Sequence, residues 1–105
     1  MPKIRKAARG KHRWLGIVLG NSYSDIESVR SDLMGLLDYK YIKLYDFVIE
    51  GNNRSCIVKI KLEKYLGVRE KLEKNDLGIF SITSSGKIRL VRSRIEEYFQ
   101  RQIDV

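Results

Sequence analysis

Apolar positions along the chain follow two periods, and together they predict seven elements. Short runs that are continuously apolar or alternate with polar residues predict strands over residues 13–19, 41–49, 55–61 and 78–83. Apolar residues three and four positions apart predict helices over residues 24–38, 62–74 and 88–100. The predicted order is therefore β-α-β-β-α-β-α.

The first six predicted elements have the order of the split β-α-β arrangement. Gly51, Asn52 and Asn53 predict a tight turn between the second and third strands, because Gly and Asn tolerate positive φ. We therefore predict an α+β, ferredoxin-like (RRM-like) fold with a four-stranded antiparallel sheet and two helices on one face. The added C-terminal helix should cover an edge of the sheet or part of its other face.

The helix over residues 24–38 has the clearest pattern. Ser24 and Glu27 have the spacing of a capping box, in which each side chain binds the backbone N–H of the other. The predicted apolar face consists of Ile26, Val29, Leu33, Leu36 and Leu37.

A chain of 105 residues has room for one hydrophobic core. We expect a basic arm over residues 1–10 and a single domain over residues 11–105. No apolar run approaches the roughly 18 residues of a membrane-spanning helix, and the start of the chain lacks the pattern of a signal peptide. The lone Cys56 excludes an internal disulfide and a multi-cysteine zinc site. A cytoplasmic location is therefore expected.

The net charge of +8 is concentrated in two segments. Residues 1–13 and residues 87–94 contain ten cations and no acid, so subtracting them leaves a net charge of −2 on the rest of the chain. Such basic segments favour polyanions, with nucleic acid first and an anionic membrane surface second. The predicted RNA-binding residues are Lys3, Arg5, Lys6, Arg9, Lys11, Arg13, Ser85, Gly86, Lys87, Arg89, Arg92 and Arg94.

Each basic segment has a second interpretation. The first could be a solvated, disordered tail, which is compatible with ordering on nucleic acid. The second could be an ordinary helix surface, with Arg89 and Arg92 on one side of the apolar face and Arg94 on the other. A glycine loop that leads into a helix exposes backbone N–H groups, so Ser85, Gly86 and their neighbouring cations favour a phosphate ligand.

Four aromatic residues of the predicted strands are candidates for stacking on RNA bases: Trp14, Tyr45, Phe47 and Phe80. RNA-binding modules of this topology use sheet aromatics in that way. The third predicted strand has no aromatic residue, however, so we favour the interpretation that these side chains belong to the core.

The sequence predicts no catalytic residue and no metal site in the protein. Hydrolysis of a phosphodiester needs clustered carboxylates that hold metal ions, or a paired acid and base. Asp25, Glu27 and Asp32 fit partners of a helix N-terminus and a solvated face, and His12 has no orienting carboxylate nearby in the sequence. Cys56 alternates with apolar residues, which favours a buried, inert thiol.

Two segments resemble a known family. Lys11-His12-Arg13-Trp14-Leu15 resembles the basic, aromatic and aliphatic start of ribonuclease P protein component 2, a small subunit shared by archaeal and eukaryotic ribonuclease P and by eukaryotic ribonuclease MRP. Ser85-Gly86-Lys87-Ile88-Arg89 resembles the Ser/Gly-Gly-Thr-Ile-Lys/Arg loop of that family, with Lys87 in place of its Thr. A basic helix with Glu97-Tyr98 near its end follows, as it does in the family. The resemblance spans residues 11–99.

The resemblance implies a non-catalytic subunit of a ribonucleoprotein endonuclease, a hydrolase of tRNA processing. Ribonuclease P removes the 5′ leader of precursor tRNA, and its catalytic RNA uses the Mg²⁺. The implied partners are that RNA, precursor tRNA and a TIM-barrel-like thirty-kilodalton subunit, with a homodimer inside a two-plus-two assembly. The alternatives are a generic ferredoxin-like RNA-binding or ribosome-associated protein, and a small nuclease that acts alone.

Overall fold

The computed structural model describes residues 12–39 and 42–103, and the predicted order of elements is confirmed there. The predicted arm over residues 1–10 lies outside the described residues. The elements are β1 (His12–Leu19), α2 (Ile26–Leu37), β2 (Leu44–Glu50), β3 (Asn53–Lys61), the short 3-10 helix η1 (Leu62–Lys64), α3 (Tyr65–Glu73), β4 (Ile79–Ser85) and α4 (Ile88–Ile103).

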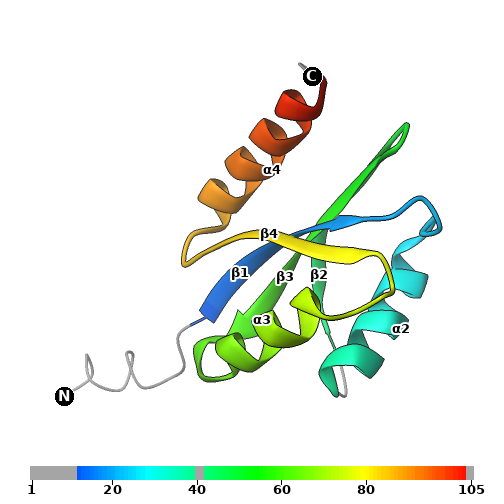
Figure 1. Cartoon of the computed structure of the whole chain (residues 1–105). Helices are drawn as coiled ribbons and strands as arrows, with labels where there is room; N and C mark the ends of the chain where they lie inside the picture. The colour runs from blue at the N-terminus through cyan, green and yellow to red at the C-terminus, as the bar shows by residue number, and fades with distance from the viewer. Residues whose placement is uncertain (1–11, 40–41, 104–105) are drawn as a thin grey trace.

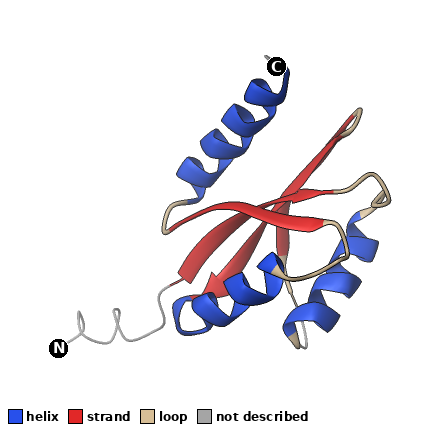
Figure 2. Cartoon of the chain, viewed as in Figure 1, coloured by secondary structure: helices blue, strands red, loops and turns tan. Residues whose placement is uncertain are grey.

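The strands form one antiparallel sheet in the order β2-β3-β1-β4, so the fold is α+β and compatible with a ferredoxin-like arrangement. Figure 1 shows α2 and α3 on one side of this sheet and α4 on the opposite side, and Figure 2 shows the same layers by element type. The added C-terminal helix therefore covers part of the second sheet face rather than an edge. In the part of the chain described, no helix is both long and apolar enough to cross a membrane.

Alternation along β1 explains why both faces of the sheet are covered. Leu15, Ile17 and Leu19 belong to the main core, which also contains buried residues of α2 and α3. Trp14 points to the other face and packs against a smaller cluster formed with Val91 and Ile95 of α4. A strand with apolar side chains on both faces reads as a continuous apolar run, which is the pattern that predicted it.

The cap of α2 differs from the expectation. Asp25, not Ser24, is the N-cap, and its side chain accepts a hydrogen bond of 2.7 Å from the backbone N–H of Ser28. This bond lowers the pKa of the Asp25 carboxyl, because it stabilises the charged form. Both Ser and Asp are good N-caps, and the spacing in the sequence does not distinguish neighbouring candidates. The buried face of the helix consists of Val29, Leu33 and Leu37.

The strand β4 is longer than predicted. Ser84 and Ser85 were expected in a loop, yet they pair with Leu15 and Trp14 across the antiparallel ladder with β1. The loop before α4 is therefore reduced to Gly86 and Lys87. Serine is a common loop residue, and here the backbone pairing of a long neighbouring strand outweighs that preference.

A bulge in β2 divides its aromatic residues between the two faces. Asp46 has a positive φ of 52°, and the register with β3 shifts between Tyr45 and Val48. Asp is one of the few residues with a side chain that tolerates this conformation. As a result Tyr45 packs in the cluster with α4, whereas Phe47 packs against the main core.

Candidate nucleic-acid interface

The end of the N-terminal basic segment lies beside the start of the second one. Because β1 and β4 are antiparallel neighbours with Trp14 opposite Ser85, Arg13 comes next to the loop that follows β4. Nη1 of Arg13 lies 3.2 Å from the position that a Cβ atom on Gly86 would occupy. Two segments that are far apart in the sequence therefore meet at the beginning of α4.

The loop itself is short and held in place. The backbone N–H of Lys87 donates to Oγ of Ser85 over 3.1 Å, and the carbonyl of Lys87 accepts from the N–H of Leu90 over 3.2 Å. Gly86 and Lys87 are both exposed. The guanidinium of Arg13 thus lies beside a helix start that the exposed Lys87 immediately precedes, and backbone N–H groups and the helix dipole there also favour an anion.

The three arginines of α4 that were predicted to bind RNA, Arg89, Arg92 and Arg94, do not form one patch. Arg92 forms an ion pair with Asp46 of β2, with 2.5 Å between Nε and Oδ2, and this partner raises the Arg92 pKa. Arg94, on the other side of the helix, donates through Nη1 to Oγ1 of Thr83 and to the carbonyl of Ser84, both over 3.1 Å. Arg89 is exposed near the start of the helix.

The expected placement of Arg92 and Arg94 on different sides of the helix is confirmed, with Arg92 towards β2 and Arg94 towards β4. The remaining predicted contact residues lie outside the described part of the chain; they are Lys3, Arg5, Lys6, Arg9 and Lys11.

Two of the four aromatic candidates form a cluster with lysines on the α4 side of the sheet. The rings of Trp14 and Tyr45 meet edge to face, with 5.1 Å between their centroids. Nζ of Lys59 lies 5.2 Å from the centroid of Trp14, and Nζ of Lys43 lies 5.4 Å from that of Tyr45. Both lysines are exposed and both rings are half-buried. A base approaching these rings would also find a cation for its phosphate.

The other two aromatic candidates have opposite environments. Phe47 packs against the main core, which confirms the core interpretation for this residue. Phe80 on β4 is 56 % exposed, so the core interpretation is wrong for it. Alternation along an edge strand, with one face covered only in part by α4, leaves this ring in solvent.

A second surface, which the sequence did not predict, has the opposite character. A groove of about 290 Å³ lies between α4 and the strands β2 and β3. Its lining includes the apolar side chains of Val48, Ile57, Ile95 and Phe99, the acidic side chains of Asp46, Glu50 and Glu96, and Arg92, which pairs with Asp46. The charged groups at its rim therefore retain a net negative charge. Such a lining suits a protein segment better than a phosphate backbone.

The residue types that could bind a catalytic metal ion, His, Cys, Asp and Glu, are not clustered within the described residues. Among residues 12–39 and 42–103, no three His, Cys, Asp or Glu side chains are grouped as a metal ion would need. Tyr23 donates a hydrogen bond to Asp32 over 2.7 Å, and burial together with this carboxylate raises the Tyr23 pKa. Asp32 is thus occupied as a structural acceptor.

Cys56 should be inert to thiol reagents in the folded protein at pH 8. Its side chain is fully buried, and desolvation raises its pKa from 9.0 to about 12. The reactive form is the thiolate, so the folded state should react only as fast as it unfolds. Because the unfolded chain releases this proton near pH 9.0, stability should also fall above that pH by up to about 1.4 kcal/mol per unit, until the folded thiol ionises near pH 12. Reaction rates with and without urea test this, and fast labelling without urea would contradict it.

The described chain therefore presents a basic corner at Arg13, Gly86 and Lys87, an aromatic and lysine cluster on the sheet, and an apolar groove with an acidic rim. Comparisons of the chain with protein-family models, with curated proteins and with solved structures give no match.

Proposed function

We propose that this chain is an RNA-binding protein, and specifically the protein component 2 subunit of ribonuclease P. The observation that carries the proposal is the meeting of Arg13 with the Gly86 and Lys87 loop at the start of α4. The two segments that resemble this family in sequence are the same two segments that meet there. Chance similarity of two short motifs would not require them to be neighbours in space.

The fold that accompanies this proposal is ferredoxin-like with one added helix. The sheet order β2-β3-β1-β4, with α2 and α3 on one face, supports it. In this arrangement α4 occupies part of the sheet face that RNA-binding modules of this topology leave open for bases. RNA contacts would therefore concentrate at the basic corner and at the Trp14 and Tyr45 cluster.

The proposed mechanism is neutralisation of RNA phosphates. Arg and Lys side chains that pair with phosphates release counterions and lower the need for Mg²⁺ in folding of the catalytic RNA. The protein would provide no group that reacts with the scissile bond, and Mg²⁺ would be held by the RNA. The groove between α4 and β2, with its acidic rim, is the surface best suited to a protein partner, including the TIM-barrel-like subunit or a second copy of this chain.

Reconstitution tests the proposal. The protein, the ribonuclease P RNA and the TIM-barrel-like subunit of the same organism should together remove the 5′ leader of precursor tRNA at a lower Mg²⁺ concentration than the RNA alone. Equal activity with and without this protein would refute the assignment to ribonuclease P. Tight binding to unrelated structured RNA without such activation would favour the generic RNA-binding alternative, and cleavage by the purified protein alone would favour the nuclease alternative.

A further inference from the structure

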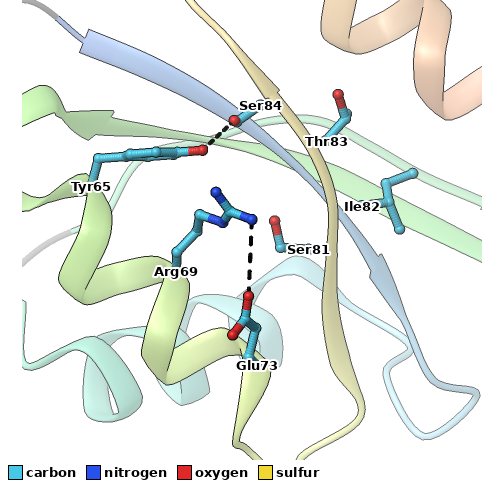
Figure 3. Close-up of a pocket in the computed structure, with 7 residues that line it drawn as sticks. All are labelled: Tyr65, Arg69, Glu73, Ser81, Ile82, Thr83 and Ser84. Atoms are coloured by element: carbon cyan, nitrogen blue, oxygen red, sulfur yellow. Dashed lines mark hydrogen bonds and ion pairs between the residues drawn. The ribbon is translucent and has the colours of Figure 1, made fainter.

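A polar pocket lies at the free edge of β4. This strand is at the end of the sheet, so only β1 pairs with it. The pocket has a volume of about 160 Å³ and lies between α3 and β4; it is lined by Tyr65, Arg69, Glu73, Ser81, Ile82, Thr83 and Ser84. Figure 3 shows Arg69, Ser81 and the Tyr65–Ser84 pair around a common space, whereas Ile82 and Thr83 point away from it.

The pocket offers several hydrogen-bond donors at fixed positions. The hydroxyls of Tyr65 and Ser84 are 2.5 Å apart and hydrogen-bonded to each other, which holds both at the rim. The guanidinium of Arg69 lies 5.9 Å from the centroid of the Tyr65 ring, where it is oriented by a cation–π contact. Two elements, α3 and β4, thus direct their polar groups into one space.

Arg69 is available to a ligand. Its side chain is 52 % exposed, and its ion pair with Glu73 is loose, with 4.0 Å between Nη2 and Oε1. That distance is too long for a hydrogen bond, and a guanidinium has five N–H donors. Within the described residues, the donors of Arg69 are therefore unused.

The edge of β4 is occupied on either side of this pocket but open beside it. Nδ2 of Asn75 donates to the carbonyl of Ile79 over 2.8 Å at the start of the strand. Arg94 donates to the carbonyl of Ser84 near its end. The hydroxyl of Ser81, between them, faces the pocket (Figure 3).

We propose that this pocket binds one phosphate group of an RNA strand that follows the free edge of β4 to the basic corner. The inference rests on the proposed function and extends it by naming a contact that neither basic segment contains. The guanidinium of Arg69 and the hydroxyl of Ser81 are the donors, and phosphate contacts in RNA-binding proteins come from such groups. From Ser81 to Ser85 the strand spans roughly 13 Å, so one RNA strand reaches both the pocket and the Gly86 and Lys87 loop.

The pocket is also lined by one carboxylate, that of Glu73, so substitutions of Arg69 and Glu73 should change RNA affinity in opposite directions. Arg69→Ala should weaken RNA binding, and Glu73→Gln should strengthen it, because the first removes the donor and the second removes a negative charge beside the phosphate. Lys71→Ala is the matched control, since Lys71 is an exposed cation on the same helix that does not line the pocket. Arg69→Lys should retain part of the affinity.

The measurement is RNA affinity as a function of salt concentration, by fluorescence anisotropy, with a thermal melt to confirm folding of each variant. Loss of one phosphate contact lowers the slope of log K against log salt by about 0.7 to 0.9, so Arg69→Ala should show this change and Lys71→Ala should not. Equal slopes and affinities for Arg69→Ala and Lys71→Ala would overturn the pocket while the proposed function stands.

A titration with inorganic phosphate distinguishes a failure of the proposed pocket from a failure of the proposed RNA-binding function. Phosphate should shift the amide resonances of Ser81 and Ser84 in the wild-type protein but not in Arg69→Ala. If the wild-type protein binds no RNA, the proposed function is wrong, and this titration alone then tests whether the pocket binds phosphate. Unchanged resonances of Ser81 and Ser84 would refute phosphate binding in the pocket.

Discussion

Gly16→Ala should destabilise the protein by about 1–3 kcal/mol and loosen α4 from the sheet. Gly16 lies in β1 directly under α4, and an added Cβ would be 2.9 Å from Cγ1 of Val91, 2.9 Å from Cγ2 of Thr83 and 3.0 Å from Cδ1 of Ile95. Such distances are shorter than carbon atoms tolerate. Val91 and Ile95 are the buried anchors of α4, so relief of the overlap requires these packed side chains to leave their rotamers or the helix to move away, and either change weakens the contact of α4 with the sheet.

Urea unfolding gives the loss of stability, and amide hydrogen exchange locates it. Exchange should become faster in α4 than in α2, which packs on the other face of the sheet. Gly35→Ala is the matched control, because Gly35 is inside α2 with no atom within 4 Å of the added Cβ. That substitution should stabilise the protein by roughly 0.5–1 kcal/mol. If Gly16→Ala left the stability and the amide exchange of α4 as Gly35→Ala does, the close packing of α4 on Gly16 would be refuted.

Replacing Arg13 and Lys87 together by Ala should weaken RNA binding by at least about a hundredfold, since hydrogen bonds to charged groups contribute about 1.5–3 kcal/mol each and every 1.4 kcal/mol is a factor of ten. The slope of log K against log salt should fall by about 1.4 to 1.8, as expected for two lost phosphate contacts. Arg13 lies beside Gly86 and Lys87 is the next residue of the same exposed loop, and the fold should survive their loss because neither belongs to a core cluster.

The double variant Lys71→Ala with Lys74→Ala removes the same net charge from two exposed residues, one in the last turn of α3 and the other directly after it. If charge alone drives binding, both double variants should lose affinity equally. If the basic corner is the RNA interface, only the variant without Arg13 and Lys87 should lose affinity for RNA. Equal losses would therefore refute the assignment of RNA binding to the meeting point of the two segments.

Much of the fold was predictable because it depends on local patterns. Three patterns indicate which faces are buried: the apolar run of β1, the alternation of Cys56, Val58 and Ile60 in β3, and the spacing of Val29 and Leu33 in α2. Burial of apolar area dominates folding, so these patterns determine the elements and their order. The ends were less predictable: Ser24 and Asp25 are equivalent caps in sequence, and Ser84 and Ser85 joined β4 only through pairing with β1.

The sequence by itself determined the order of elements, the two apolar faces of the sheet and the confinement of positive charge to two short segments. Only the tertiary structure decided that Arg13 lies at Gly86, that Arg92 and Arg94 are directed to opposite edges, and that Arg69 shares a pocket with Ser81. The physical reason is that charge and periodicity are properties of neighbouring residues, whereas these contacts follow from which strands pair. That pairing is set by the burial of the whole core.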